Sequence, residues 1–196
     1  MDETPALEST LEALLISTGI VALAEIGDKT QLLSLALATR YKRPWPIILG
    51  ILVATLLNHA LAAGLGTWLT GLIGPEVLRW VLALSFFAMA AWMLVPDRLD
   101  EAAARTSRWG VLATTTLAFF IVEMGDKTQI ATIALAARFD AFQAVVAGTT
   151  LGMLIANAPV VVLGDRVAGR LPVRLIHRIS AAIFAALGVL TLLAPA

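Results

Sequence analysis

The sequence predicts an all-α integral membrane protein with six transmembrane helices, arranged as two inverted three-helix repeats. Of the 196 residues, 59% are hydrophobic and 14% are charged, whereas soluble domains carry about 25% charged residues. Six apolar segments stand out, each close to or above the ~20 residues that a helix needs to cross the hydrocarbon core. The second half of the chain also repeats the first half at a displacement of 98 residues.

The expected spans are residues 11–39, 46–71, 76–95, 109–138, 142–169 and 172–194. The first, second, fourth and fifth are longer than the membrane requires, so we expect them to tilt, protrude or be interrupted. We place the interruptions at Gly27 and Gly125. Pro159 removes a helical hydrogen bond, so it should kink the fifth span.

The repeat is clearest in one charged septet, Glu25–Gln31, which recurs almost unchanged as Glu123–Gln129. The same displacement aligns Gly50 with Gly148 and Phe86 with Phe184, without a gap. Because three spans per copy is an odd number, the second copy enters the membrane from the opposite side, as in many secondary transporters. We expect a first repeat over residues 1–96, a cytoplasmic linker over 97–108 and a second repeat over 109–196.

Lysines and arginines are unequally divided between the two sides of the expected spans. If the amino terminus lies outside, the cytoplasmic connections hold ten of these residues and the outer connections hold two. Cytoplasmic loops carry the excess of positive charge, so both termini should be non-cytoplasmic. The ten are Arg40, Lys42, Arg43, Arg98, Arg105, Arg108, Arg166, Arg170, Arg174 and Arg178, and the two are Arg79 and Arg138.

The septet supplies candidate metal ligands. Glu25 and Asp28 are three residues apart and share one helical face, and Glu123 and Asp126 repeat this spacing. Oxygen donors of this kind suit hard divalent cations, and the absence of cysteine with only two histidines disfavours zinc or copper. Without metal, some of the crowded carboxylates should hold protons, which predicts cation–proton exchange. Further candidate ligands are Thr30, Thr128, Gln31 and Gln129.

A second tier of candidates is Asn58, His59 and Asn157, which lie in the second and fifth spans. Their alternative role is hydrogen bonding between helices. Lys29 and Lys127 either neutralise the motif or extend away from it, and the whole motif could instead be a structural network of ion pairs. Two further residues are expected outside the site: His177 at the membrane interface and Asp165 at a span end.

Several function classes are disfavoured. The motif lacks a serine or cysteine nucleophile paired with histidine, so we expect no enzyme and no catalytic residues, and we expect no cofactor. The net charge of zero argues against nucleic acid as a partner. The expected partners are a divalent cation and the lipid bilayer, with a homo-oligomer left open. An exporter of a polar or amino-acid solute and a membrane scaffold are the alternatives.

The paired Glu-x-Gly-Asp-Lys-Thr motifs resemble those of the Gdt1 family, also called uncharacterised protein family 0016. The resemblance covers nearly the whole chain. It implies exchange of Ca²⁺ or Mn²⁺ for protons, with motif carboxylates at Glu25, Asp28, Glu123 and Asp126. Bacterial relatives look like manganese exporters. The chain lacks the amino-terminal extension and acidic central loop of eukaryotic members, so the resemblance implies a bacterial plasma (inner) membrane.

Overall fold

The computed structural model describes residues 4–95, 110–164 and 172–193, and within these ranges the chain is helical and contains no strand. Its helices are α1 (Thr4–Glu25), α2 (Lys29–Tyr41), α3 (Pro44–Leu72), α4 (Pro75–Trp92), α5 (Gly110–Glu123), α6 (Lys127–Phe139), α7 (Phe142–Leu163) and α9 (Val173–Leu193). The expected linker 97–108, the arginines at positions 98, 105, 108, 166 and 170, and Asp165 lie outside the described residues.

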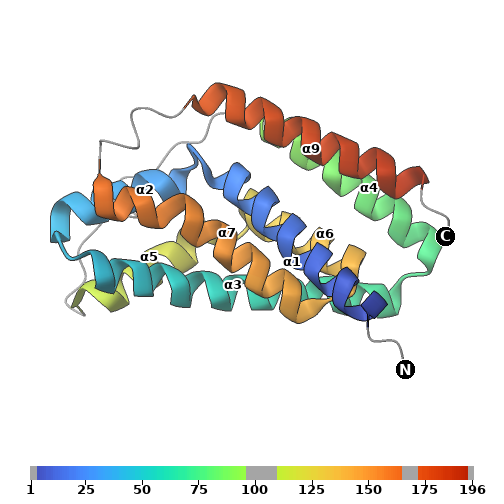
Figure 1. Cartoon of the computed structure of the whole chain (residues 1–196), viewed down its shortest axis with the longest axis horizontal. Helices are drawn as coiled ribbons and strands as arrows, with labels where there is room; N and C mark the ends of the chain where they lie inside the picture. The colour runs from blue at the N-terminus through green and yellow to red at the C-terminus, as the bar shows by residue number, and fades with distance from the viewer. Residues whose placement is uncertain (1–3, 96–109, 165–171, 194–196) are drawn as a thin grey trace.

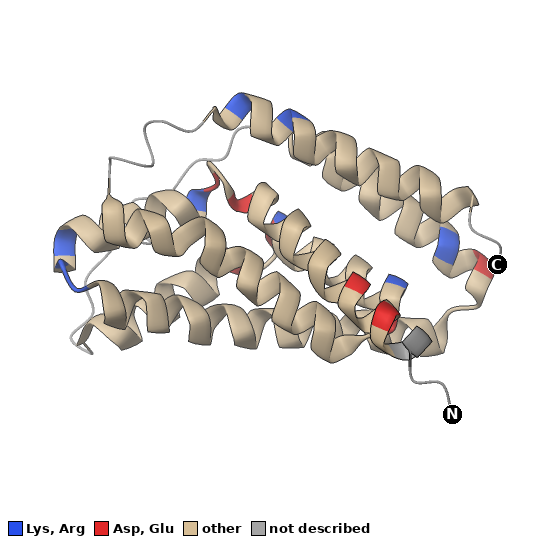
Figure 2. Ribbon diagram, in the orientation of Figure 1, with Lys and Arg blue, Asp and Glu red and all other residues tan. Residues whose placement is uncertain are grey.

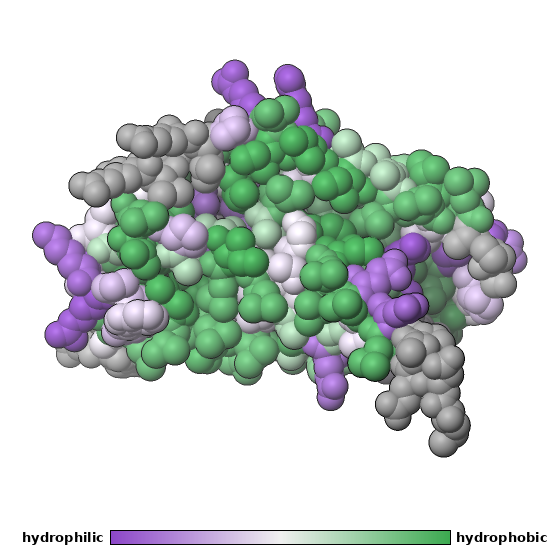
Figure 3. All heavy atoms as spheres, in the orientation of Figure 1, coloured by the Kyte–Doolittle hydropathy of each residue, from purple (hydrophilic) through white to green (hydrophobic). Residues whose placement is uncertain are grey.

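The helices run roughly along the long axis of the molecule (Figure 1). Among the described residues, five are long and apolar enough to cross a membrane, namely α1, α3, α4, α7 and α9. Their large apolar side chains are exposed, for example Leu61, Leu84 and Ile155, and they form a broad hydrophobic band on the face shown in Figure 3. Such a surface is stable against lipid rather than water, so the chain is a multi-pass membrane protein.

The two predicted interruptions are confirmed. α1 gives way to α2 at Gly27, whose φ is 82°, and α5 gives way to α6 at Gly125, whose φ is 76°. Both angles lie in the left-handed region that glycine adopts without the penalty of a Cβ atom. The fourth expected span is consequently divided between α5 and α6, neither of which reaches the length of a span alone.

The other two long segments are not interrupted where the structure describes them. α3 is one continuous helix, and α7 continues through Pro159 to Leu163. α3 and α7 carry no charged residue, as their uniform colour in Figure 2 shows. α7 accepts a hydrogen bond from Gln31 of α2 through Ala156 O at 3.1 Å, and α3 places His59 beside Glu123.

Close helix contacts occur in pairs that are 98 residues apart. A Cβ atom added to Gly50 of α3 would lie 2.6 Å from Thr115 Cβ and 3.0 Å from Leu112 O of α5. One added to Gly148 of α7 would lie 3.0 Å from Ser17 Cβ and 2.5 Å from Leu14 O of α1. Glycine at these positions lets the helices approach closely. α4 and α9 pack on each other through Phe86 and Phe184, whose ring centroids are 6.4 Å apart.

Candidate cation site

The two helix breaks bring four acidic side chains into the interior of the protein. Glu25 is the last residue of α1 and Asp28 precedes α2, while Glu123 and Asp126 hold the same places between α5 and α6. All four are buried. Asp28 and Asp126 have nearly identical extended backbones, with φ, ψ of −79°, 168° and −81°, 168°. Each break thus directs a glutamate and an aspartate inward from a similar local conformation.

Three of the four carboxylates gather tightly. Glu25, Asp28 and Asp126 each offer one oxygen atom, and these atoms lie within 4.8 Å of one another. Oxygen ligands at about 2.3–2.6 Å from a Ca²⁺ ion, or somewhat closer to a smaller ion, are separated by distances of this order. The group therefore has the dimensions of a divalent-cation site and draws on both breaks.

The motif lysines cross between the breaks. Lys29 Nζ lies 3.0 Å from Asp126 Oδ1, and Lys127 Nζ lies 3.0 Å from Asp28 Oδ1. Lys127 is 1% exposed and Lys29 is 24% exposed. Each ammonium group pairs with an aspartate of the other break, so in this conformation the lysines do not extend away from the motif.

The threonines and glutamines support the breaks. The Thr30 hydroxyl donates to Glu25 Oε2, and the Thr128 hydroxyl donates to Glu123 Oε2 at 3.1 Å. The carboxamide oxygens of Gln31 and Gln129 accept the backbone N–H groups of the break glycines, at 3.0 and 2.7 Å respectively. In this conformation the glutamine oxygens hold the unwound backbone and do not face the carboxylate group.

The fourth carboxylate lies beside a histidine. Glu123 Oε2 is 3.9 Å from Nε2 of His59 on α3, and both side chains are fully buried. Glu123 is not a member of the three-carboxylate group. The sequence predicts that four carboxylates converge, whereas the structure brings three together and places Glu123 beside them. The Glu25 Oε1, Glu123 Oε1 and His59 Nδ1 atoms are buried and make no hydrogen bond in the described structure, which leaves them available to a cation or proton.

The two asparagines serve mainly as links between helices. Asn58 Nδ2 donates to Phe120 O at 3.1 Å, and Asn157 Oδ1 accepts the Ser34 hydroxyl at 2.7 Å. These bonds tie α3 to α5 and α7 to α2. The interhelical role that the sequence left open for these residues is therefore present in the structure.

Sequence reasoning did not single out Ser34, and it missed the contact of His177 with the first break. Ser34 of α2 is fully buried, and its match with Thr132 at the repeat distance was an available signal. His177 is 9% exposed, and its Nε2 lies 2.8 Å from the backbone oxygen of Ile26. Its expected interfacial position stays a prediction, and the structure adds that the first turns of α9 fold against the break between α1 and α2.

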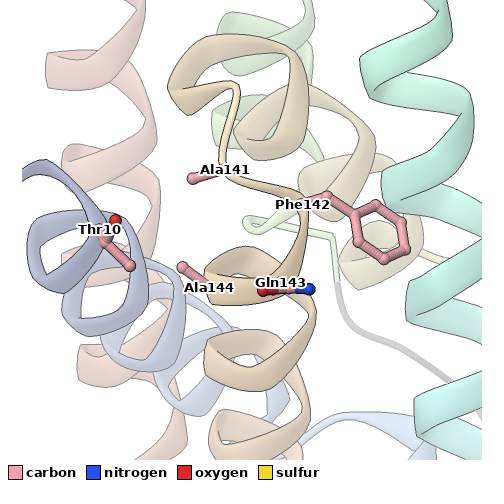
Figure 4. Close-up of a pocket in the computed structure, with 5 residues that line it drawn as sticks. All are labelled: Thr10, Ala141, Phe142, Gln143 and Ala144. Atoms are coloured by element: carbon pink, nitrogen blue, oxygen red, sulfur yellow. The ribbon is translucent and has the colours of Figure 1, made fainter. Parts of the chain in front are cut away.

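A surface cavity lies elsewhere. It encloses about 330 Å³ and is lined by Thr10, Ala141, Phe142, Gln143 and Ala144 (Figure 4). Thr10 lies fifteen residues before Glu25 along α1, a separation of about 20 Å in a helix. With no ionisable side chain in its lining, this cavity lacks the chemistry of the carboxylate group.

The protein combines apolar membrane helices with a buried group of acidic side chains, and two helix breaks supply these side chains. This combination is typical of membrane cation transporters. The chain belongs to the divalent cation/proton antiporter family GDT1, whose profile matches residues 13–101 and 111–196. This family is one of membrane transporters.

The relatives agree with this assignment. A Vibrio cholerae protein named "Putative manganese exporter" is 52% identical over 178 residues, covering 90% of this chain and 88% of its own. A Synechocystis protein named GDT1-like protein sll0615 is 28% identical, with 84% and 89% covered. GDT1-like protein 3 of Arabidopsis thaliana is 25% identical, with 94% and 71% covered. No solved structure matches the chain.

Proposed function

We propose that this antiporter exports Mn²⁺ from the cytoplasm in exchange for protons, with Ca²⁺ as an alternative substrate, in a bacterial inner membrane. The observation that carries the proposal is the convergence of Glu25, Asp28 and Asp126 oxygens to within 4.8 Å of one another in the interior. Carboxylate oxygens suit both ions. The name of the Vibrio cholerae relative supports manganese.

In this proposal the cation replaces the lysines as partner of the aspartates. Asp28 and Asp126 each hold an ammonium group at 3.0 Å, and a cation that binds between them provides the same charge compensation. Glu25 completes the ligand set, and Thr30 and Thr128 orient the glutamates through their hydroxyl groups. Protons take the place of the cation on the carboxylates when the site is empty of metal.

The proposal includes two inverted repeats, residues 1–96 and 109–196, with α1–α2 and α5–α6 each forming one broken span. Three sets of contacts that match at 98 residues support it: the crossed lysine pairs, the threonine–glutamate bonds and the glycine contacts at Gly50 and Gly148. α1 begins and α9 ends at the same end of the molecule (Figure 1). The basic turn between α2 and α3 lies at the opposite end (Figure 2), which supports non-cytoplasmic termini.

The proposal is tested in proteoliposomes that enclose a pH indicator. Addition of Mn²⁺ or Ca²⁺ should drive proton movement in the opposite direction, and a metal competition series across pH ranks the two ions. Glu25→Gln and Asp28→Asn should abolish the signal, while Glu76→Gln, an exposed position on α4, should leave it intact. If neither metal moves protons, the antiport proposal is wrong. If both site variants keep full activity, the proposed cation site is wrong.

The alternative of a polar or amino-acid exporter is less well supported. A substrate carboxylate would need cationic groups in the cavity, but the ammonium groups of Lys29 and Lys127 are each held 3.0 Å from an aspartate. Stabilisation by metal ions, but not by amino acids, in a detergent thermal-unfolding assay separates the two candidates.

A further inference from the structure

The two helix breaks are alike inside but are covered differently. At the first break, a Cβ atom added to Gly27 would lie 2.2 Å from Cγ1 of Val173, so the first residue of α9 is seated directly on the glycine. One turn later on α9, His177 Nε2 contacts Ile26 O at 2.8 Å. The amino-terminal turns of α9, residues 173–178, thus form a cap over the first break.

The second break has no such cap in the described part of the chain. Nothing among the described residues lies within 4 Å of a Cβ atom added to Gly125. Met124, which matches Ile26 at the repeat distance, is 53% exposed, and Gly125 is exposed as well. Pro75 and Arg79 of α4 match Val173 and His177 in the repeat, but no equivalent seat on Gly125 is formed.

This difference has a consequence for access to the carboxylate group, whose ligands come from both breaks. An apolar side chain packed on Gly27 excludes water and hydrated cations from the first break, whereas Met124 and Gly125 of the second break are exposed in the described part of the chain. Among the described residues, the first break is therefore covered by α9, and the second break has no comparable cover.

We propose that the α9 cap is the gate of the first break, and that His177 is the positioning residue that holds the gate shut through the Ile26 backbone oxygen. The inference rests on the proposed function, since a transporter must open each break in turn. The gate is held by one hydrogen bond and one packed apolar residue, whose net stabilisation is modest, so it can open. Opening frees the backbone carbonyl of Ile26, the residue that follows Glu25. The hydrogen bond of His177 goes to the Ile26 backbone oxygen and not to a proposed ligand, so His177 acts through the backbone.

The chain contains no cysteine, which allows a direct test with single cysteines at Ile26 and at its match, Met124. The rate of labelling by a charged maleimide is measured in nanodiscs, where both membrane faces are accessible. In the parent background, Ile26→Cys should react more slowly than Met124→Cys. Adding His177→Ala should raise the Ile26→Cys rate by at least about fivefold, the population change that loss of one hydrogen bond typically produces.

Two variants control this result. His177→Gln places an amide donor near the same carbonyl and should keep the slow rate. Arg178→Ala removes an exposed neighbour on α9 and should also leave the rate unchanged. If His177→Ala fails to fold, Val173→Ala opens the seat on Gly27 instead and should likewise accelerate labelling.

Two results would overturn the gate: equal Ile26→Cys rates with and without His177 or Val173, or an equal acceleration by Arg178→Ala. Labelling does not require transport, so the two proposals fail separately. If the protein moves no cations but its labelling rate depends on His177, the gate is supported and the proposed function is wrong. If the protein transports cations but its labelling rate does not depend on His177, only the gate proposal is wrong.

Discussion

The two lysine–aspartate pairs have the same length but differ in their surroundings. Lys127 and its partner Asp28 are each 1% exposed, whereas Lys29 is 24% exposed. Removing one member of a fully buried pair leaves the other charge without compensation, a loss of about 3–5 kcal/mol in proteins. We therefore expect Lys127→Gln to lower the thermal unfolding midpoint in detergent clearly more than Lys29→Gln does. Equal losses in the two variants would contradict the difference in burial.

A double variant separates the structural role of this pair from its role in transport. Lys127→Gln with Asp28→Asn removes both charges, so much of the lost stability should return. Transport should stay absent, because Asp28 is a proposed ligand. The unfolding midpoint and cation-driven proton flux are measured on the same preparation, with Lys29→Gln/Asp126→Asn as the matched variant. A stable double variant that still transports would favour the purely structural interpretation of the motif.

Helix packing depends on glycines that are placed where helices cross. In α3, a Cβ atom at position 50 would meet Thr115 Cβ at 2.6 Å, while Gly71 has no described neighbour within 4 Å of that position. Gly50→Ala should therefore push α3 from α5 and lower the unfolding midpoint. Gly71→Ala should be neutral or stabilising, by up to about 1 kcal/mol, because alanine is the better helix former. A comparison of the two midpoints checks this, and a stabilising Gly50→Ala would show that the contact relaxes freely.

The helices and their breaks were largely predictable, because they follow from local sequence patterns. Apolar length located the spans, and a glycine within a charged motif located both breaks, since only glycine tolerates the left-handed backbone there. The division of the fourth span into two shorter helices, α5 and α6, follows from the same glycine, Gly125. The acidic and threonine members of the candidate site were likewise visible in the repeated septet.

What the sequence could not supply is how the two halves are placed against each other. Two nearly identical motifs do not encode that Lys29 reaches Asp126, that Glu25 joins the cluster, or that Glu123 lies beside His59 instead. The contact of His177 with Ile26 spans 151 residues and leaves no periodic signal. The seat of Val173 on Gly27 likewise has no equivalent on Gly125 among the described residues, so the repeat could not predict this asymmetry.

The charge balance of the whole interior predicts the stoichiometry of exchange. Four motif carboxylates and two lysines carry a formal charge of −2 when ionised, and either one divalent cation or two protons neutralise it. Any other loading leaves net charge in a low-dielectric interior, which is costly. We therefore expect two protons per cation and no net charge movement. In proteoliposomes clamped with potassium and valinomycin, the cation gradient reached at equilibrium should not change with voltage, and Glu25→Gln liposomes provide the baseline. Exchange of three protons would instead move one charge, and 100 mV would then shift the equilibrium by about 2.3 kcal/mol, or roughly fiftyfold.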